Sequence, residues 1–242
     1  MTTPKRPRIL DVSKIVETIH GLQARIDQQF PGSGLAGVCG SLGQAARATS
    51  WRTAALSRPY WGLRLLAFIV VAAVLAAQIY IADHVDWSGI PGRTTPAELA
   101  QGLNAMVNLL LLAFAGLWFV LTLERRWKRQ RVFAYLYEFR SLAHIIDMHQ
   151  LTKDPTTVLS AGLPTVWRPE KKMSAPQLAR YLDDCTEMLA LIAKLAALYA
   201  ERTQDREVTD AVNEIEDLTS QLGRKIWEKI MVLEQRRAAH PA

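Results

Sequence analysis

The chain has 242 residues and a formal net charge of +6, and half of its residues are hydrophobic. The basic charge belongs to one part of the chain: residues 1–131 hold 15 Lys or Arg against 7 Asp or Glu, whereas residues 132–242 hold 14 against 16. The distal part therefore lacks a basic patch interleaved with aromatics, which excludes nucleic acid as the expected partner. The hydrophobic residues gather in two blocks, a pattern that indicates a membrane protein.

The first predicted element is an amphipathic helix over residues 11–29. Its apolar residues recur every three or four positions, so they share one helical face: Val12, Ile15, Val16, Ile19, Leu22 and Ile26. Pro31 and Gly32 end this helix. The segment before it is basic but has no apolar core, so no cleaved signal peptide is predicted and the first membrane span acts as an uncleaved anchor.

A glycine-rich segment follows, with Gly32, Gly34, Gly37, Gly40 and Gly43. No predicted strand precedes it and no Lys-Ser or Lys-Thr pair follows, so it does not match a phosphate-binding loop. It predicts a flexible joint instead. Residues 44–58 predict a short basic helix on the inner membrane surface, because arginines alternate there with small or apolar residues.

Residues 61–82 and 103–123 are the two apolar blocks. Each is close to the ~20 residues that cross a ~30 Å hydrocarbon layer as a helix. Aromatic residues lie near the block edges, as in interfacial belts: Tyr60, Trp61, Tyr80, Trp87, Trp118 and Trp127. The alternative, two buried helices of a soluble protein, is disfavoured because such helices usually keep a polar face. Residues 83–102 are then an external loop in which a helix begins at Pro96.

Basic residues indicate the orientation of the two spans. The external loop carries only Arg93. The other basic residues near the spans lie at the start of the first span or at the end of the second: Arg47, Arg52, Arg58, Arg64, Arg125, Arg126, Lys128, Arg129 and Arg131. Because basic side chains resist translocation, both termini are predicted in the cytoplasm. Arg64 is expected to extend its guanidinium to the lipid headgroups. The Ala-, Leu- and Arg-rich composition is typical of a bacterial inner-membrane protein.

Polar and small residues mark possible contacts inside the membrane. Gln78, Asn104 and Asn108 should face protein or water, either in interhelical hydrogen bonds or lining a pore, because unsatisfied amides are costly in hydrocarbon. Small residues permit close helix packing, within a chain or between chains: Ala72, Ala73, Ala76, Ala77 and Gly116.

The distal part predicts further helices. The second membrane helix is expected to continue through 132–151, and prolines mark an irregular connection up to residue 172. Two helices with coiled-coil-like apolar spacing follow, one from Ser174 to about Thr203 and one beginning near Val208, joined by a polar turn. They should pair as an antiparallel hairpin and close a three- or four-helix bundle.

His144, Asp147 and His149 are the most suggestive chemical group, because His and carboxylate side chains bind zinc. His149 faces away from the other two on a helix, so a metal would need Asp183, Asp184 or Glu187 from another helix. Hydrogen bonding within the bundle is the alternative, and it is the one that we expect. No catalytic or nucleotide-binding motif is present, so neither an enzyme nor a cofactor is predicted.

The predicted fold class is therefore an all-α membrane protein, with a two-helix transmembrane hairpin and a cytoplasmic helical bundle. Its parts are an N-terminal cytoplasmic region at 1–58, the hairpin at 59–124 and the bundle at 125–242. The expected function is a self-associating, membrane-anchored interaction or scaffold protein, with the lipid bilayer, further copies and a cytoplasmic protein as partners. The alternatives are an oligomeric ion channel or pore-forming effector, and a metal-dependent enzyme in the bundle.

Overall fold

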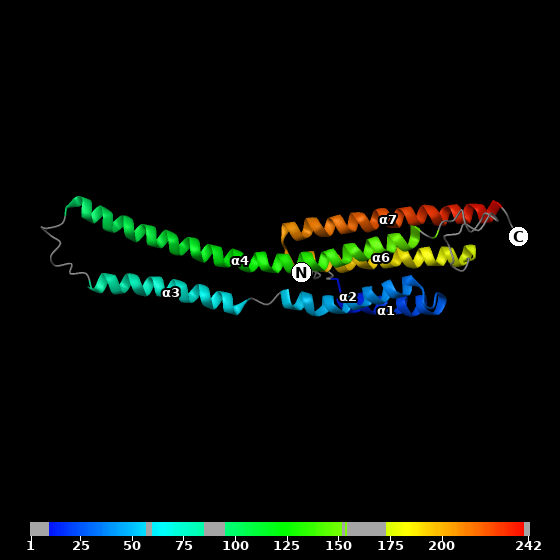
Figure 1. Cartoon of the computed structure of the whole chain (residues 1–242), viewed down its shortest axis with the longest axis horizontal. Helices are drawn as coiled ribbons and strands as arrows, with labels where there is room; N and C mark the ends of the chain where they lie inside the picture. The colour runs from blue at the N-terminus through cyan, green and yellow to red at the C-terminus, as the bar shows by residue number, and fades with distance from the viewer. Residues whose placement is uncertain (1–9, 57–59, 85–94, 152, 154–172, 240–242) are drawn as a thin grey trace, which may run out of the picture. The chain divides into compact units, whose positions relative to one another are not determined.

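The computed structural model describes residues 10–56, 60–84, 95–151, 153 and 173–239, and within these residues it is all-helical, as predicted. The chain divides into two compact units, Met1–Ser57 with Arg131–Ala242, and Arg58–Gln130. We refer to them as the bundle and the hairpin (Figure 1). Several predictions lie outside the described residues: those on the N-terminal segment before residue 10, on Arg58, on most of the external loop and on the connection at 154–172.

Helix α1 spans Val12–Gln29, as its apolar spacing predicts. The Asp11 side chain accepts a hydrogen bond from the Ser13 backbone N–H at 2.9 Å, which satisfies one free donor of the first turn. The predicted apolar face is the buried one, with Ile15, Ile19, Leu22 and Ile26 in the core. Phe30, just past the helix, packs edge-on against Tyr181 with ring centroids 5.4 Å apart.

The predicted flexible joint is wrong, because helix α2 runs unbroken over Gly34–Leu56. Its apolar residues are buried at helical spacing, at Leu35, Val38, Cys39 and Leu42. One glycine permits close packing, because a Cβ on Gly34 would overlap the His149 ring. A Cβ on Gly43 would lie 3.6 Å from the Ile19 Cγ2 of α1, which is an ordinary contact distance. Tertiary contacts therefore stabilise a helix that glycine content alone disfavours.

The basic segment predicted as a separate surface helix is the second half of α2. One of its faces is buried in the bundle, with Ala45, Ala46, Thr49 and Thr53. Arg47 and Trp51 are exposed. The helix is therefore longer than predicted. The arginine spacing did not indicate that one face of it packs against other helices.

The two apolar blocks lie in helix α3, Trp61–His84, and helix α4, Pro96–Leu151. The α4 helix begins at Pro96, where the missing N–H leaves no helical bond unmade. It continues through the second block to Leu151, which confirms the predicted helix over 132–151. Among the described residues these two helices are long and apolar enough to cross a membrane.

Helices α6, Ala175–Thr203, and α7, Arg206–Ala239, form the predicted antiparallel pair. Ser174 and Gln177 make a capping box at the start of α6, in which each side chain bonds the other residue's backbone N–H. Gln204, at φ 49° and ψ 32°, adopts the left-handed conformation that ends α6. Helix α6 therefore has a local cap at both ends.

The bundle contains five helical segments rather than three or four: α1, α2, the distal part of α4, α6 and α7 (Figure 1). Arg52 of α2 bonds Glu138 of α4, and Gly34 at the start of α2 lies against His149 near the end of α4. These two helices therefore run antiparallel. Lys229 of α7 bonds Gln150 near the end of α4. The start of α7 lines a groove with the residues around Phe133, so α4 and α7 run parallel.

Candidate functional site

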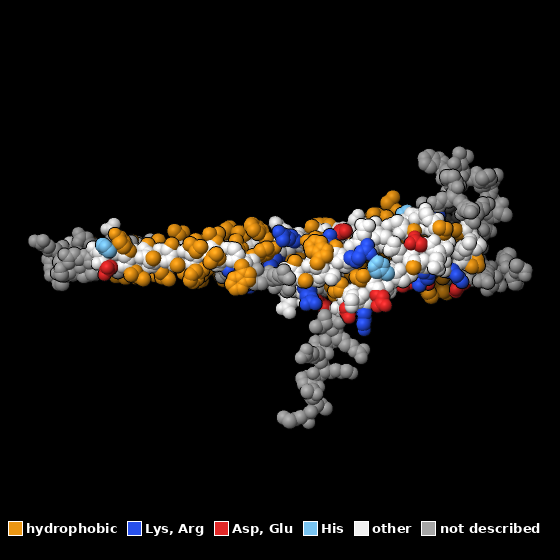
Figure 2. Space-filling view, turned by 90° about the horizontal axis from the view of Figure 1, so that it is seen from below, with side chains coloured by type: hydrophobic (Ala, Val, Ile, Leu, Met, Phe, Trp, Pro, Cys, Tyr) orange, Lys and Arg blue, Asp and Glu red, His pale blue; other side chains and the backbone are white. Residues whose placement is uncertain are grey.

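The hairpin exposes apolar side chains on most of its surface, as the described part in Figure 2 shows. On α3 these include Leu65, Phe68, Ile69 and Ile79, and on α4 Leu103, Leu112, Phe114 and Phe119. The side chains facing between the two helices are fewer and follow a spacing of three and four, at Ala67, Val71, Val74 and Gln78 of α3 and at Ala113, Leu117, Val120 and Glu124 of α4. We call this line of contact the seam.

The small residues predicted for helix packing do not lie in the seam. Ala72, Ala73, Ala76 and Ala77 of α3 are exposed, and so is Gly116 of α4. A Cβ on Gly116 would meet no atom within 4 Å. Their packing against other described residues is therefore not observed.

The predicted polar residues of the hairpin occupy different positions. Gln78 is half-buried in the seam, and its Nε2 is buried with no hydrogen-bond partner among the described residues. Asn104 and Asn108 are exposed on α4. The structure therefore does not bring the three amides together within one chain.

Glu124, a residue that the sequence analysis did not single out, organises one end of the hairpin. This carboxylate is buried and receives Lys128 Nζ at 3.0 Å, Arg64 Nε at 3.5 Å and the Tyr60 backbone N–H at 3.3 Å. Arg64, expected to reach toward headgroups, thus pairs across to α4. Arg125 and Arg126 are exposed beside it, and Arg129 is half-buried. The sequence offers a signal for part of this contact, because Glu124 follows an apolar block directly and lies four residues before Lys128, a spacing that favours an ion pair on a helix.

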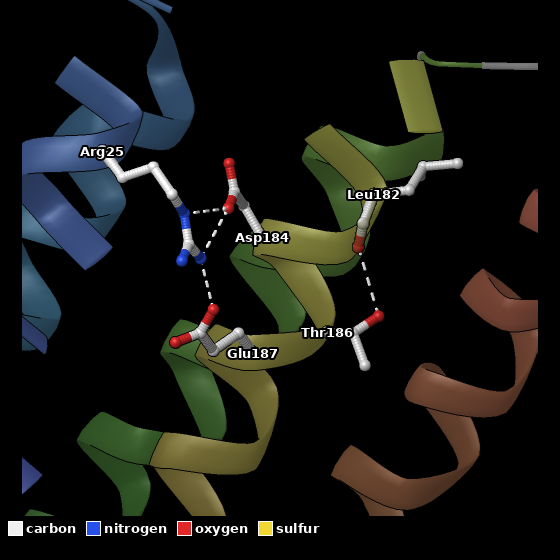
Figure 3. A network of polar contacts seen from close by, with 5 residues as sticks. All are labelled: Arg25, Leu182, Asp184, Thr186 and Glu187. Atoms are coloured by element: carbon white, nitrogen blue, oxygen red, sulfur yellow. Dashed lines mark hydrogen bonds and ion pairs between the residues drawn. The ribbon is translucent and has the colours of Figure 1, made fainter. Parts of the chain in front are cut away.

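A polar cluster joins α1 to α6 within the bundle (Figure 3). Arg25 Nε and Nη2 donate to Asp184 Oδ1 at 3.1 and 2.9 Å, and Nη2 also contacts Glu187. The bond to Glu187 raises the pKa of Arg25, whereas burial raises the pKa of Asp184 despite the guanidinium. Asp184 is the more deeply buried partner, so the desolvation cost falls on it. Its second oxygen is buried with no hydrogen-bond partner among the described residues.

A second polar network joins α2, α4 and α6. Arg52 Nη1 donates to Glu138 at 2.8 Å, and its guanidinium carbon lies 4.2 Å from the centre of the Tyr135 ring. The Tyr199 hydroxyl donates to Thr49 at 3.2 Å, and its ring is 5.7 Å from that of Tyr135. These contacts fix the relative register of three helices. The side chains named here do not form a group of acid, base and nucleophile.

The predicted metal ligands do not form a site within the described residues, where no three His, Cys, Asp or Glu side chains converge. His144 is exposed, Asp147 Oδ1 accepts a bond from Gln150 at 2.5 Å, and His149 lies against Gly34. Asp184 and Glu187, the proposed additional ligands, bind Arg25 instead. Of the three residues in the predicted group, Asp147 makes a hydrogen bond of the kind that the alternative expects.

The two cysteines, Cys39 and Cys185, are buried free thiols. Burial raises the pKa of each thiol to about 12. Because the thiolate is the reactive form, neither is suited to redox or nucleophilic chemistry near neutral pH.

A groove of about 350 Å³ lies between α4 and α7 on the bundle. Its floor is apolar, with Phe133, Leu136 and Ile215, and its α7 rim is acidic, with Glu207, Asp210 and Glu214. Arg140 pairs with Glu214 across it at 3.4 Å. The groove therefore combines an apolar floor with an acidic rim.

No protein-family model, curated protein or solved structure matches this chain. The functional argument therefore depends on the residues and geometry above.

Proposed function

We propose that the chain is a membrane-anchored helical scaffold, in which the hairpin crosses the bilayer and the bundle stands on its cytoplasmic side. The observation that carries the proposal is the apolar surface of α3 and of α4 up to Leu123, exposed around both helices. Soluble proteins rarely leave so continuous an apolar surface in water. A lipid bilayer would cover it, and the helical backbone satisfies its own hydrogen bonds there.

The charge distribution supports the orientation with both termini in the cytoplasm. Glu124 neutralises part of the positive charge of Arg64 and Lys128, but Arg125 and Arg126 stay exposed at the same end of the hairpin. Basic residues near span ends favour the cytoplasmic side and attract anionic headgroups. We expect this end to lie at the inner surface of the membrane.

The bundle supplies the interaction surface of the proposed scaffold. Besides the groove beside Phe133, it exposes Met148 and Leu151 of α4 and Trp227 and Met231 of α7. The two α4 residues lie within two positions of Gln150, and the two α7 residues lie within two positions of Lys229, which bonds Gln150. Exposed aromatic and Met side chains are common where protein partners bind, which favours a cytoplasmic protein partner here.

An ion channel built from several hairpins is the alternative function, and the polar residues of α4 support it less well. Gln101, Asn104 and Asn108 lie in the part of the helix near Pro96. Further along the same face, Leu111, Ala115 and Trp118 are apolar. A hydrated conduit would need polar or backbone groups along more of its length.

The test combines extraction with thiol labelling of the full chain. The natural cysteines are buried and protonated, so single added cysteines at Lys14 and Asp83, both exposed, provide the label sites. We expect the protein to stay in alkaline-washed membranes. A membrane-impermeant maleimide should label Asp83→Cys on intact cells and Lys14→Cys only after permeabilisation.

The chain without added cysteines is the control for background labelling. Release of the protein by alkaline washing would contradict membrane insertion. Labelling of Lys14→Cys on intact cells, with retention in the membrane, would leave the anchor in place and reverse the orientation.

A further inference from the structure

The residues of α4 that pack on α3 identify, through the helical repeat, the residues on the opposite side of α4. In the seam α4 presents Ala113, Leu117 and Val120, which are half-buried. A helix turns once in 3.6 residues, so residues nine positions apart lie two and a half turns apart and point in opposite directions. Asn104 lies nine positions before Ala113, and Asn108 lies nine before Leu117. Both asparagines therefore project away from α3 by helical geometry, and they are exposed, as are all residues of α4 from 101 to 112.

The uncharged polar residues of α4 between 100 and 123 all fall on this outer side. They are Gln101, Asn104, Asn108 and Thr122. Together with three apolar residues between them they follow a spacing of three and four, which makes a stripe that winds slowly around the helix. We call this line the amide stripe: Gln101, Asn104, Asn108, Leu111, Ala115, Trp118 and Thr122.

Among the residues that the structure describes, the amides of the stripe have no side-chain hydrogen-bond partner. In the described residues neither Asn104 nor Asn108 makes a side-chain hydrogen bond, while the Thr122 hydroxyl is satisfied by the carbonyls of Trp118 and Phe119. Asn108 lies about 7 Å deeper than the start of the second block, at 1.5 Å per residue. Lipid tails offer no hydrogen bonds, so an amide there needs a protein or water partner.

We infer that the amide stripe is the contact surface between two copies of this chain, packed α4 against α4. This inference depends on the proposed membrane insertion. A primary amide carries both donors and an acceptor, so an identical amide on a second copy complements it. Copies inserted with the same topology have parallel α4 helices, and a two-fold axis between them brings Asn104 beside Asn104 and Asn108 beside Asn108. The small Ala115 allows the helices to approach closely further along.

Oxidative cross-linking of the full chain in membranes tests this contact. Leu111 lies in the stripe, at its edge, and its neighbour Leu110 is an exposed leucine of nearly the same depth that lies closer to the seam. Both leucines line a hollow with Val71 and Val74 of α3. We expect Leu111→Cys to form disulfide-linked dimers at least several-fold more efficiently than Leu110→Cys. The chain without added cysteines should form none, because its thiols are buried.

A second variant tests the amides themselves. Replacing Asn104 and Asn108 together by Leu keeps an apolar helix but removes the hydrogen bonds. Interhelical bonds of this kind are modest, so we expect the dimer of the Leu111→Cys chain to weaken on the order of ten-fold.

The outcomes separate this inference from the membrane anchor. Equal cross-linking at Leu110→Cys and Leu111→Cys in a chain retained by washed membranes would overturn the contact and leave the anchor intact, whereas loss of membrane retention would overturn both. A cross-link from Leu111→Cys to a different protein would assign the stripe to another partner. Labelling of Asn108→Cys by an impermeant thiol reagent would show that the stripe faces water, as in a channel.

Discussion

The bundle and the hairpin use similar helices but place their apolar residues in opposite ways. In the bundle Tyr181, Tyr199 and Phe139 are fully buried. In the hairpin Phe68 and Leu112 are each 71% exposed. The difference follows from the pattern and not from the amount of apolar sequence: a stripe with polar residues between predicts a core, whereas an apolar surface all around predicts a nonpolar environment outside the chain.

Helix α4 contains both patterns in one element. Up to Leu123 its apolar side chains are mostly exposed, whereas from Val132 its buried residues recur every three or four positions: Val132, Leu136, Phe139, Ala143 and Ile146. Substitutions in one helix can therefore compare the two environments without changing the secondary structure around them.

The largest expected difference is between Phe139→Ala and Phe114→Ala, two phenylalanines of α4 that are 0% and 65% exposed. Removing the buried ring leaves a cavity and should lower the stability of the bundle by about 3–5 kcal/mol. Removing the exposed Phe114 ring should change the stability of the bundle by less than ~0.5 kcal/mol. Hydrogen exchange of α6 amides in the full chain measures both, and equal effects would mean that Phe114 also packs in a core.

The Arg25–Asp184 pair is expected to give the next largest effect. Arg25→Met leaves a buried carboxylate with less compensation and should cost about 1–3 kcal/mol at neutral pH, a range reduced because Arg25 is partly exposed. Asp184→Asn keeps an acceptor for Arg25 without a charge to desolvate, so its effect should be smaller and nearly independent of pH.

The pH dependence of Arg25→Met provides a sharper test. Burial raises the pKa of Asp184 above its usual 3.8 in the folded wild type. The contribution of such a group to the free energy of unfolding is present below its unfolded pKa and is lost as pH rises through the folded pKa. Without Arg25 that pKa should rise further. The penalty of Arg25→Met should therefore be greatest near neutral pH and shrink on acidification, as the carboxyl becomes protonated. A penalty that grows on acidification, measured by exchange of α1 and α6 amides, would contradict this account.

The smallest expected effects concern the glycines of α2. A Cβ on Gly37 would meet no atom within 4 Å, so Gly37→Ala should stabilise the bundle by about 0.5–1 kcal/mol through helix propensity. Gly34→Ala should destabilise it, because its Cβ would overlap His149. Thermal unfolding of the detergent-solubilised chain compares the two. Two neutral substitutions would favour the flexible joint that the glycine content predicts.

Local patterns were sufficient for α1, α6, α7 and the apolar parts of α3 and α4. Asp11 and Ser174 are capping residues at helix starts, and Pro96 opens α4. Each of these signals acts within a few residues, through a backbone donor or a repeating apolar face. The sequence by itself therefore determined the helical class and the presence of two apolar blocks.

Only the tertiary structure decided which helices meet. The α2 helix is stable because Leu35 and Cys39 are buried among other helices, although its glycines oppose helix formation locally. Arg25 and Asp184 are 159 residues apart in the chain, and Glu124 holds Arg64 across the hairpin. The outward direction of Asn104 and Asn108 likewise depends on which face of α4 packs on α3. Such pairings arise from the burial of whole helix faces against one another, which no local spacing encodes.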